Sequence, residues 1–191
     1  LKPGGTNFRT HGFYKKSGTA YFKATKGNLI FSGVFMAIGL IFPGILMTQP
    51  INGNDLFVAL PFFVTLLPLV FFIAGFILFR SSTKPIVFSK ITGYFWKGRL
   101  KENENPSQKP LKEFCKLIDI EALQIVSERV RSSSSGSSGR SSSYRSYEIN
   151  LVLRDASRLN VIDHGNKNKL MEDAKKLADY LGVPIWEGAR Y

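Results

Sequence analysis

The stretch Leu29–Met47, LIFSGVFMAIGLIFPGILM, contains no Asp, Glu, His, Lys or Arg. A helix rises about 1.5 Å per residue and the hydrocarbon core of a bilayer is roughly 30 Å thick, so a helix over this stretch can cross it. A second stretch without charge, Leu56–Phe79, follows a short connector, Thr48–Asp55. Cores of soluble proteins seldom contain two such helices without a polar face. The sequence therefore predicts an integral membrane protein with a transmembrane helical hairpin, residues 29–79, formed by spans 29–47 and 56–79.

The composition of the two spans indicates that they pack closely and argues against a role in transport. Small residues in the first span, among them Gly33, Gly39 and Gly44, are predicted to let the second helix approach closely. Neither span contains an ionisable side chain of the kind that transporters and channels place at membrane depth. The spans therefore predict packing and anchoring rather than transport.

Positive charge is distributed unevenly around the predicted hairpin. The basic segment 1–28 and the part after the second span are rich in Lys and Arg, whereas the connector Thr48–Asp55 contains one acid and no base. The positive-inside rule then predicts a multi-pass protein of the bacterial inner (cytoplasmic) membrane with both termini in the cytoplasm. The net charge of +12 is thereby directed at an anionic leaflet, and no nucleic-acid partner is needed to explain it. Because the chain begins with Leu1, we expect some residues to precede it.

Residues 84–191 are predicted to form one cytoplasmic domain, a small antiparallel β-sheet capped by a C-terminal helix. The segment Lys84–Leu100 predicts two short strands around a turn, and Ile118–Val130 predicts a longer strand with a bulge or a short turn near Ala122. Further alternation indicates strands at 147–153 and 158–163. A helix is expected at 166–181, because apolar residues recur there at helical spacing before Gly182. The segment 19–25 is either an added strand or an interfacial segment. The fold class is thus α+β, with an element order similar to pleckstrin-homology-like domains.

The serine-rich run Arg131–Arg145, RSSSSGSSGRSSSYR, has the composition of a linker between domains. The segments on either side of it are single amphipathic strands, and neither can bury its apolar face alone. We therefore interpret residues 131–145 as a mobile loop between two neighbouring strands of one sheet.

Few residues suit catalysis or metal binding. Asp163 and His164 form an adjacent acid–imidazole pair at a strand-to-helix junction, but we expect Asp163 and Asn166 to be turn and cap residues and His164 to be exposed. His11 is isolated in the basic segment, and the single cysteine, Cys115, has no partner for a disulfide or a metal. No phosphate-binding loop or nucleophile elbow is present in the sequence. The sequence predicts no catalytic, cofactor-binding or metal-binding residue, no cofactor, and no enzyme activity.

The stretch AKKLADYLGVPI, residues 174–185, resembles the C-terminal end of the photosystem I assembly factor family of cyanobacteria and chloroplasts. The matching residues are Ala174, Leu177, Ala178, Leu181, Val183, Pro184 and Ile185. That family also has two spans near the N-terminus and a strand-rich domain that ends in this helix. With GYFWKG at 93–98 and INLVLRDASRLNVIDHG at 149–165, the chain is also similar to uncharacterised bacterial two-span inner-membrane proteins. The serine-rich run departs from the assembly factors, so the resemblance implies the architecture and a scaffolding role only.

These observations predict a non-catalytic accessory subunit or assembly scaffold of a larger inner-membrane complex. The expected partners are membrane lipids and other integral membrane subunits, and a homo-oligomer stays open. The alternative is a membrane-anchored cytoplasmic module that binds anionic lipid or a peptide partner.

Overall fold

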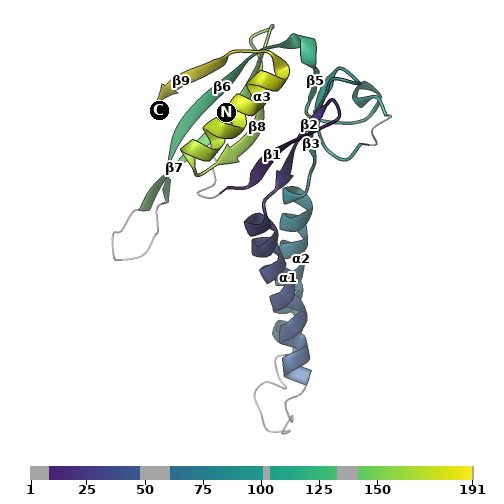
Figure 1. The fold of residues 1–191 in the computed structure, drawn as a ribbon. Helices are drawn as coiled ribbons and strands as arrows, with labels where there is room; N and C mark the ends of the chain where they lie inside the picture. Colours follow the sequence, from purple (N-terminus) through teal and green to yellow (C-terminus); the bar gives the residue numbers. More distant parts are fainter. Residues whose placement is uncertain (1–8, 48–60, 101–103, 133–141, 191) are drawn as a thin grey trace. The chain divides into compact units, whose positions relative to one another are not determined.

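The computed structural model describes residues 9–47, 61–100, 104–132 and 142–190 (Figure 1). Within these ranges the chain forms three α-helices and two β-sheets, so the predicted α+β class is confirmed. The chain divides into two compact units: unit 1 contains residues 1–25 and 84–191, and unit 2 contains residues 26–83.

Unit 2 contains helices α1, Lys26–Met47, and α2, Pro61–Ser82. Within the described residues one helix, Lys26–Ile45, is long and apolar enough to cross a membrane, and a shorter apolar helix covers Leu66–Ser82. The first predicted span therefore coincides with α1. The connector at 48–55 and the start of the second predicted span at 56–60 lie outside the described residues.

Two glycines let α1 and α2 come close together. A Cβ atom at Gly39 would lie 2.6 Å from the backbone nitrogen of Phe72, and one at Gly75 would lie 2.6 Å from that of Met36. No other residue type fits at such distances, so the close approach predicted at Gly39 is confirmed. The same prediction is wrong for Gly33 and Gly44, because a Cβ atom there would meet no described atom within 4 Å.

The first sheet of unit 1 has five antiparallel strands in the order β1-β2-β3-β4-β5. Their bounds are His11–Lys16, Thr19–Ala24, Ile86–Ser89, Tyr94–Lys97 and Phe114–Lys116. Strand β2 confirms that the segment 19–25 contributes a strand to the later domain. Strands β3 and β4 confirm the hairpin predicted at Lys84–Leu100. Two short 3-10 helices also belong to unit 1, η2 at Pro106–Gln108 and η3 at Leu117–Asp119.

The second sheet has four strands in the order β8-β7-β6-β9. Their bounds are Ile120–Ser132 for β6, Ser142–Leu153 for β7, Arg158–His164 for β8 and Ile185–Arg190 for β9. The pairing register shifts between Ile120 and Ala122, so of the bulge and the short turn predicted near Ala122 the structure has the bulge. Strands β6 and β7 are neighbours in one sheet and pair as far as Ser132 and Ser142, so the serine-rich run connects two strands of one sheet as predicted. The predicted loop bounds 131–145 are wrong at both ends, because residues 131–132 belong to β6 and residues 142–145 belong to β7. Its residues 133–141 lie outside the described part of the chain.

The prediction of one antiparallel sheet is wrong in two respects. Unit 1 contains two sheets, and β9 pairs with β6 in parallel. The reason for the parallel pair is the helix α3, Lys167–Leu181, which connects β8 to β9. A strand that must return in the same direction needs such a crossover connection.

Helix α3 covers one face of the second sheet (Figure 1). The side chain of Asn166 accepts a hydrogen bond from the backbone nitrogen of Lys169 at 3.1 Å, and Gly182 ends the helix with φ 77°. These are the N-cap and C-cap that the sequence predicts. The helix buries the apolar stripe Leu170, Ala174, Leu177 and Ala178. One core cluster joins these residues to aromatic side chains of the first sheet, including Phe22, Phe88 and Phe95.

Candidate functional site

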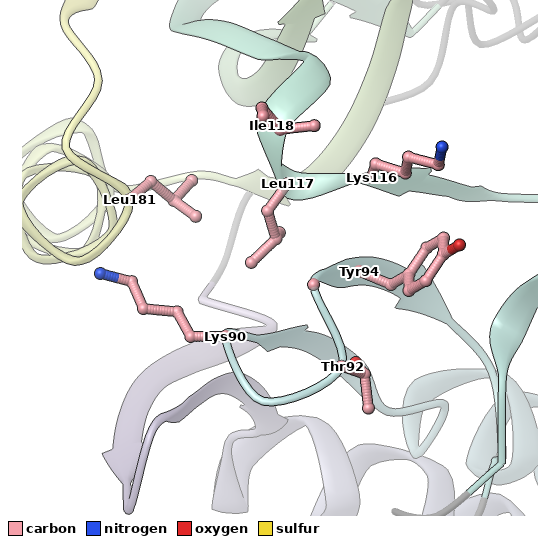
Figure 2. Close-up of a pocket in the computed structure, with 8 residues that line it drawn as sticks. Lys90, Thr92, Tyr94, Lys116, Leu117, Ile118 and Leu181 are labelled. Carbon is pink, nitrogen blue, oxygen red and sulfur yellow. The ribbon is translucent and has the colours of Figure 1, made fainter.

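A pocket of about 630 Å³ opens at one end of unit 1. It is bordered by the β3–β4 turn, the junction of β5 with η3, and the last residue of α3 (Figure 2). Its lining residues are Lys90, Thr92, Gly93, Tyr94, Lys116, Leu117, Ile118 and Leu181. Lys90 and Lys116 lie on opposite sides of the opening, with Leu117 between them (Figure 2). Among the described residues that line the pocket none is acidic, so it combines positive charge with an apolar wall.

Backbone hydrogen bonds fix the shape of the pocket. The Gly93 nitrogen donates to the Ser89 carbonyl at 2.8 Å, and the Leu117 nitrogen donates to the Gly93 carbonyl at 2.8 Å. Gly93 has φ 78°, a left-handed conformation that glycine adopts without steric cost. The turn and η3 therefore hold each other in place.

Tyr180 of α3 ties this end of the unit together. Its hydroxyl donates to the carbonyl of Gly18 at 2.6 Å and accepts from the backbone nitrogen of Lys90 at 3.2 Å. The Lys90 ammonium lies 4.8 Å from the centre of the Tyr180 ring, and the Lys15 ammonium lies 5.6 Å from it. Both distances are within the range of a cation–π contact. The lysines are thus held near the pocket while their charges stay available.

Two isoleucines beside the pocket are unusually exposed. Ile91, in the β3–β4 turn, is 77% exposed, and Ile118, in η3, is 69% exposed. No other large hydrophobic side chain in the described part of the chain is as exposed as these two, including those of α1 and α2. We call Lys90, Ile91, Lys116 and Ile118 the end patch. Exposed apolar side chains near an open pocket make this end of unit 1 a candidate interaction surface.

A second group of polar side chains lies between the two sheets of unit 1, and most of its members are partly buried. The Lys97 ammonium donates to the Asn160 side-chain oxygen at 3.1 Å, and the Asn160 amide donates to the Asp163 carboxylate at 2.8 Å. Lys97 also lies 3.7 Å from the carboxylate of Glu113. Glu148 is buried opposite Asp163 on the neighbouring strand. We call these five residues the Lys97 cluster.

Burial shifts the pKa values within the Lys97 cluster. It lowers the pKa of Lys97, although the nearby Glu113 and Asp163 carboxylates oppose that shift. It raises the pKa of Asp163 and of Glu148, and the negative charges of neighbouring acids add to the rise. Shifted pKa values are common at catalytic sites and also within structural ion-pair networks. The polar groups of this cluster form hydrogen bonds with one another, as in a structural ion-pair network.

The structure corrects the predicted setting of Asp163 and His164. Strand β8 continues through both residues, and their side chains face opposite sides of the sheet: Asp163 pairs with Glu148, and His164 with Tyr147. His164 is 0% exposed, so the prediction that it is exposed is wrong. Asp163 is not a turn residue either, whereas Asn166 is the predicted cap. The two side chains therefore form no acid–base pair.

His164 is held by its neighbours. Its Nδ1 accepts a hydrogen bond from the backbone nitrogen of Asn166 at 2.9 Å, while its Nε2 is buried without a hydrogen-bond partner. Burial, reinforced by the positive charge of Arg9, lowers the pKa of His164 to about 4. Arg9 itself forms an ion pair with the buried Asp173 of α3 at 2.8 Å. His11 lies beside Thr10, with 3.0 Å between its Nδ1 and the Thr10 hydroxyl. These contacts attach β1 to α3 and β8.

Cys115 is buried, and burial together with Asp119 raises the pKa of its thiol to about 12. Such a thiol is a poor nucleophile at neutral pH. No group of three or more His, Cys, Asp or Glu side chains suited to a metal ion occurs among the described residues.

The sequence did not point to the end patch or to the Lys97 cluster. Lysines and isoleucines in turns have no distinctive spacing, so nothing in the sequence brings residues 90 and 118 together. The cluster had a weaker signal. Glu148 and Asn150 share one face of the predicted strand with Val152, and that apolar residue indicates that the face is covered.

No protein-family model matches the chain, and no curated protein is significantly similar to it. The resemblance to the photosystem I assembly factor family therefore stays a prediction.

Proposed function

We propose that the chain is a non-catalytic accessory or assembly subunit that is anchored in a membrane and docks on a larger membrane complex. In this proposal α1 and α2 form a hairpin in the bacterial inner membrane, with both termini in the cytoplasm. The observation that carries it is the exposed apolar surface of unit 2. Large apolar side chains point outward along both helices, including Ile30, Leu40, Ile41, Leu67 and Ile77.

The physical reason is the cost of that surface in water. Exposed apolar area costs about 25 cal/mol per Å², so a helix pair with this many exposed aliphatic and aromatic side chains needs an apolar surrounding. Lipid supplies one, and the helices of neighbouring subunits supply another. Contacts between membrane helices depend on close packing rather than on hydrophobicity. The glycine contacts of Gly39 and Gly75 show that this helix pair already packs in that way.

The arrangement of unit 1 supports a role without catalysis. The groups with shifted pKa values in the Lys97 cluster, together with His164 and Cys115, make their contacts within the fold. Glu172, on the surface of α3, forms ion pairs with Lys169 and Lys176. The open site is the pocket beside the end patch, where the charged groups are lysines held by Tyr180. This site suits binding better than it suits proton transfer.

Site-specific photo-crosslinking in native membranes tests this proposal. A photoreactive amino acid at Leu40, which is exposed on α1, is expected to give a discrete adduct with one membrane protein. The matched control is Ser32, which is buried on the same helix and is expected to give no adduct with another protein. Adducts with lipid alone at Leu40, together with monomeric migration on native gels, would contradict a docking role.

A further inference from the structure

We propose that the end patch and the pocket between its lysines bind an acidic segment of a partner protein that also carries bulky apolar side chains. This inference rests on the proposed function, because it names the chemistry of the partner that unit 1 recognises.

Charge complementarity is the first argument. Lys90 and Lys116 flank the opening, Lys15 lies at the Tyr180 ring beside it, and no described lining residue is acidic. The described lining of the pocket therefore presents two positive charges, Lys90 and Lys116, and no carboxylate. An acidic partner segment approaches such a surface faster and pairs with it selectively.

The apolar part of the end patch is the second argument. Ile118 lines the pocket together with Leu117 and Leu181, Ile91 follows the lining residue Lys90 in the chain, and both isoleucines are exposed. Isoleucines at such exposure gain from being covered, at about 25 cal/mol per Å² of apolar area. A ligand with charge alone leaves them in water, whereas a segment with both acidic and apolar side chains covers them. Interfaces between proteins have this composition, an apolar centre with a charged rim.

The pocket is also formed in advance. The bond from Leu117 to Gly93 and the bonds of Tyr180 to Gly18 and Lys90 hold the three borders of the pocket in one arrangement. A preformed site loses little conformational entropy on binding, so more of its contact energy appears as affinity.

Peptide binding to the full-length chain in neutral phosphatidylcholine nanodiscs tests the inference. The probe is a fluorescent synthetic peptide in which glutamates alternate with leucines, followed by anisotropy. One control peptide has lysines in place of the glutamates, and another has serines in place of the leucines. We expect the first peptide to bind at least about tenfold more tightly than either control, because charge and apolar contact both contribute.

Two double variants locate the binding. Lys90→Glu with Lys116→Glu is expected to weaken binding by about tenfold or more. The matched control is Lys167→Glu with Lys175→Glu, which makes the same change in net charge at exposed positions of α3 and is expected to change affinity by less than about twofold. Equal losses in both double variants, or no preference for the first peptide, would overturn the inference.

Repeating the titration in nanodiscs that contain phosphatidylglycerol separates lipid from protein. Displacement of the peptide by this lipid, abolished in the Lys90→Glu, Lys116→Glu variant, would assign the site to a headgroup and overturn the inference. The photo-crosslinking experiment at Leu40 tests the proposed function separately. A protein adduct at Leu40 without peptide binding would contradict only the further inference. Peptide binding without such an adduct would contradict only the proposed docking of the helices.

Discussion

Lys97 and Lys90 lie in the same sheet, one at the end of β4 and the other just after β3, in opposite environments. Lys97 is enclosed by Asn160, Asp163 and Glu113. Lys90 lies over an aromatic ring at the edge of an open pocket without a carboxylate in its described lining. Burial forces a charge to find its partners within the chain, because an unpaired buried charge costs several kcal/mol. An exposed charge needs no internal partner, so the comparison separates lysines that stabilise the fold from lysines that remain available for a ligand.

The largest expected effect is at the partly buried Lys97. Replacing Lys97 by Met removes the charge and the hydrogen bond to Asn160 and leaves Asp163 without a compensating cation. The loss of a hydrogen bond made by a charged group, with little added by the partly exposed Glu113, is expected to lower the unfolding free energy by about 2 to 3 kcal/mol. Denaturant unfolding of the chain in detergent, followed by the fluorescence of the buried Trp96, measures it. Lys116→Met is the matched control, and an equal loss there would remove the distinction between the two kinds of lysine.

The next effect concerns pH. The pKa of His164 is about 4 in the folded chain, below its ordinary value of 6.5. Its stabilising contribution is therefore complete above pH 6.5 and is lost as the pH falls through 4, by about 3 kcal/mol in all. Glu148 and Asp163 act in the opposite sense, because their raised pKa values favour the folded state as the pH falls.

His164→Asn isolates the histidine from the acids. The Asn side-chain oxygen replaces Nδ1 as the acceptor for the Asn166 nitrogen and does not titrate. We expect the variant to lose much less stability than the parent between pH 6.5 and pH 4, as measured by denaturant unfolding at each pH. Parallel stability curves for the two proteins over this range would show that His164 does not carry the effect.

The error at His164 shows what the sequence contains and what it lacks. Alternation of apolar residues predicts β6, β7 and β8, and apolar residues at helical spacing predict α3, because each element has one apolar face against a common core. The Gly165 that follows His164 suggests a break in the strand, yet β8 runs through His164 because that residue pairs with Tyr147 and forms a bridge with Arg9. Arg9 is far away in sequence, so the pairing cannot be inferred from local pattern.

The polar face of the second sheet and the end patch were missed for the same physical reason. Glu148 and Asn150 have the composition of a solvated face, and only the contact of Lys97 with Asn160 on β8 shows that the two sheets meet there. The end patch needs the turn at Lys90, the edge at Lys116 and the end of α3 to converge. The local sequence pattern predicts strands and which residues share a face. It does not predict which distant turns lie side by side, because that depends on tertiary packing.

A smaller effect is expected at Tyr180. Replacing it by Phe keeps the ring under Lys90 and removes the hydroxyl that bonds to Gly18 and Lys90. The loss of a buried hydrogen bond costs about 1 to 2 kcal/mol, and the β1–β2 and β3–β4 turns lose a common attachment. Denaturant unfolding measures the cost, and hydrogen exchange at the Lys90 amide reports whether that turn loosens. Unchanged exchange at Lys90 would indicate that the backbone bonds alone hold the pocket.

The smallest expected effect on stability is at the end patch. Lys90 and Lys116 each keep their ammonium outside the core, and neither forms an ion pair among the described residues. Reversing both charges to Glu is therefore expected to lower the unfolding free energy by at most about 1 kcal/mol, because the cation–π contact of Lys90 with Tyr180 is the one interaction lost among the described residues. Denaturant unfolding beside Lys97→Met makes the comparison direct. Selection for folding alone gives no reason to place two lysines and two exposed isoleucines around one pocket, so a stability-neutral variant that loses peptide affinity would assign these residues to binding. A loss comparable to that of Lys97→Met would instead mean that the end patch is part of the folded core, and the separation between buried and available lysines would fail.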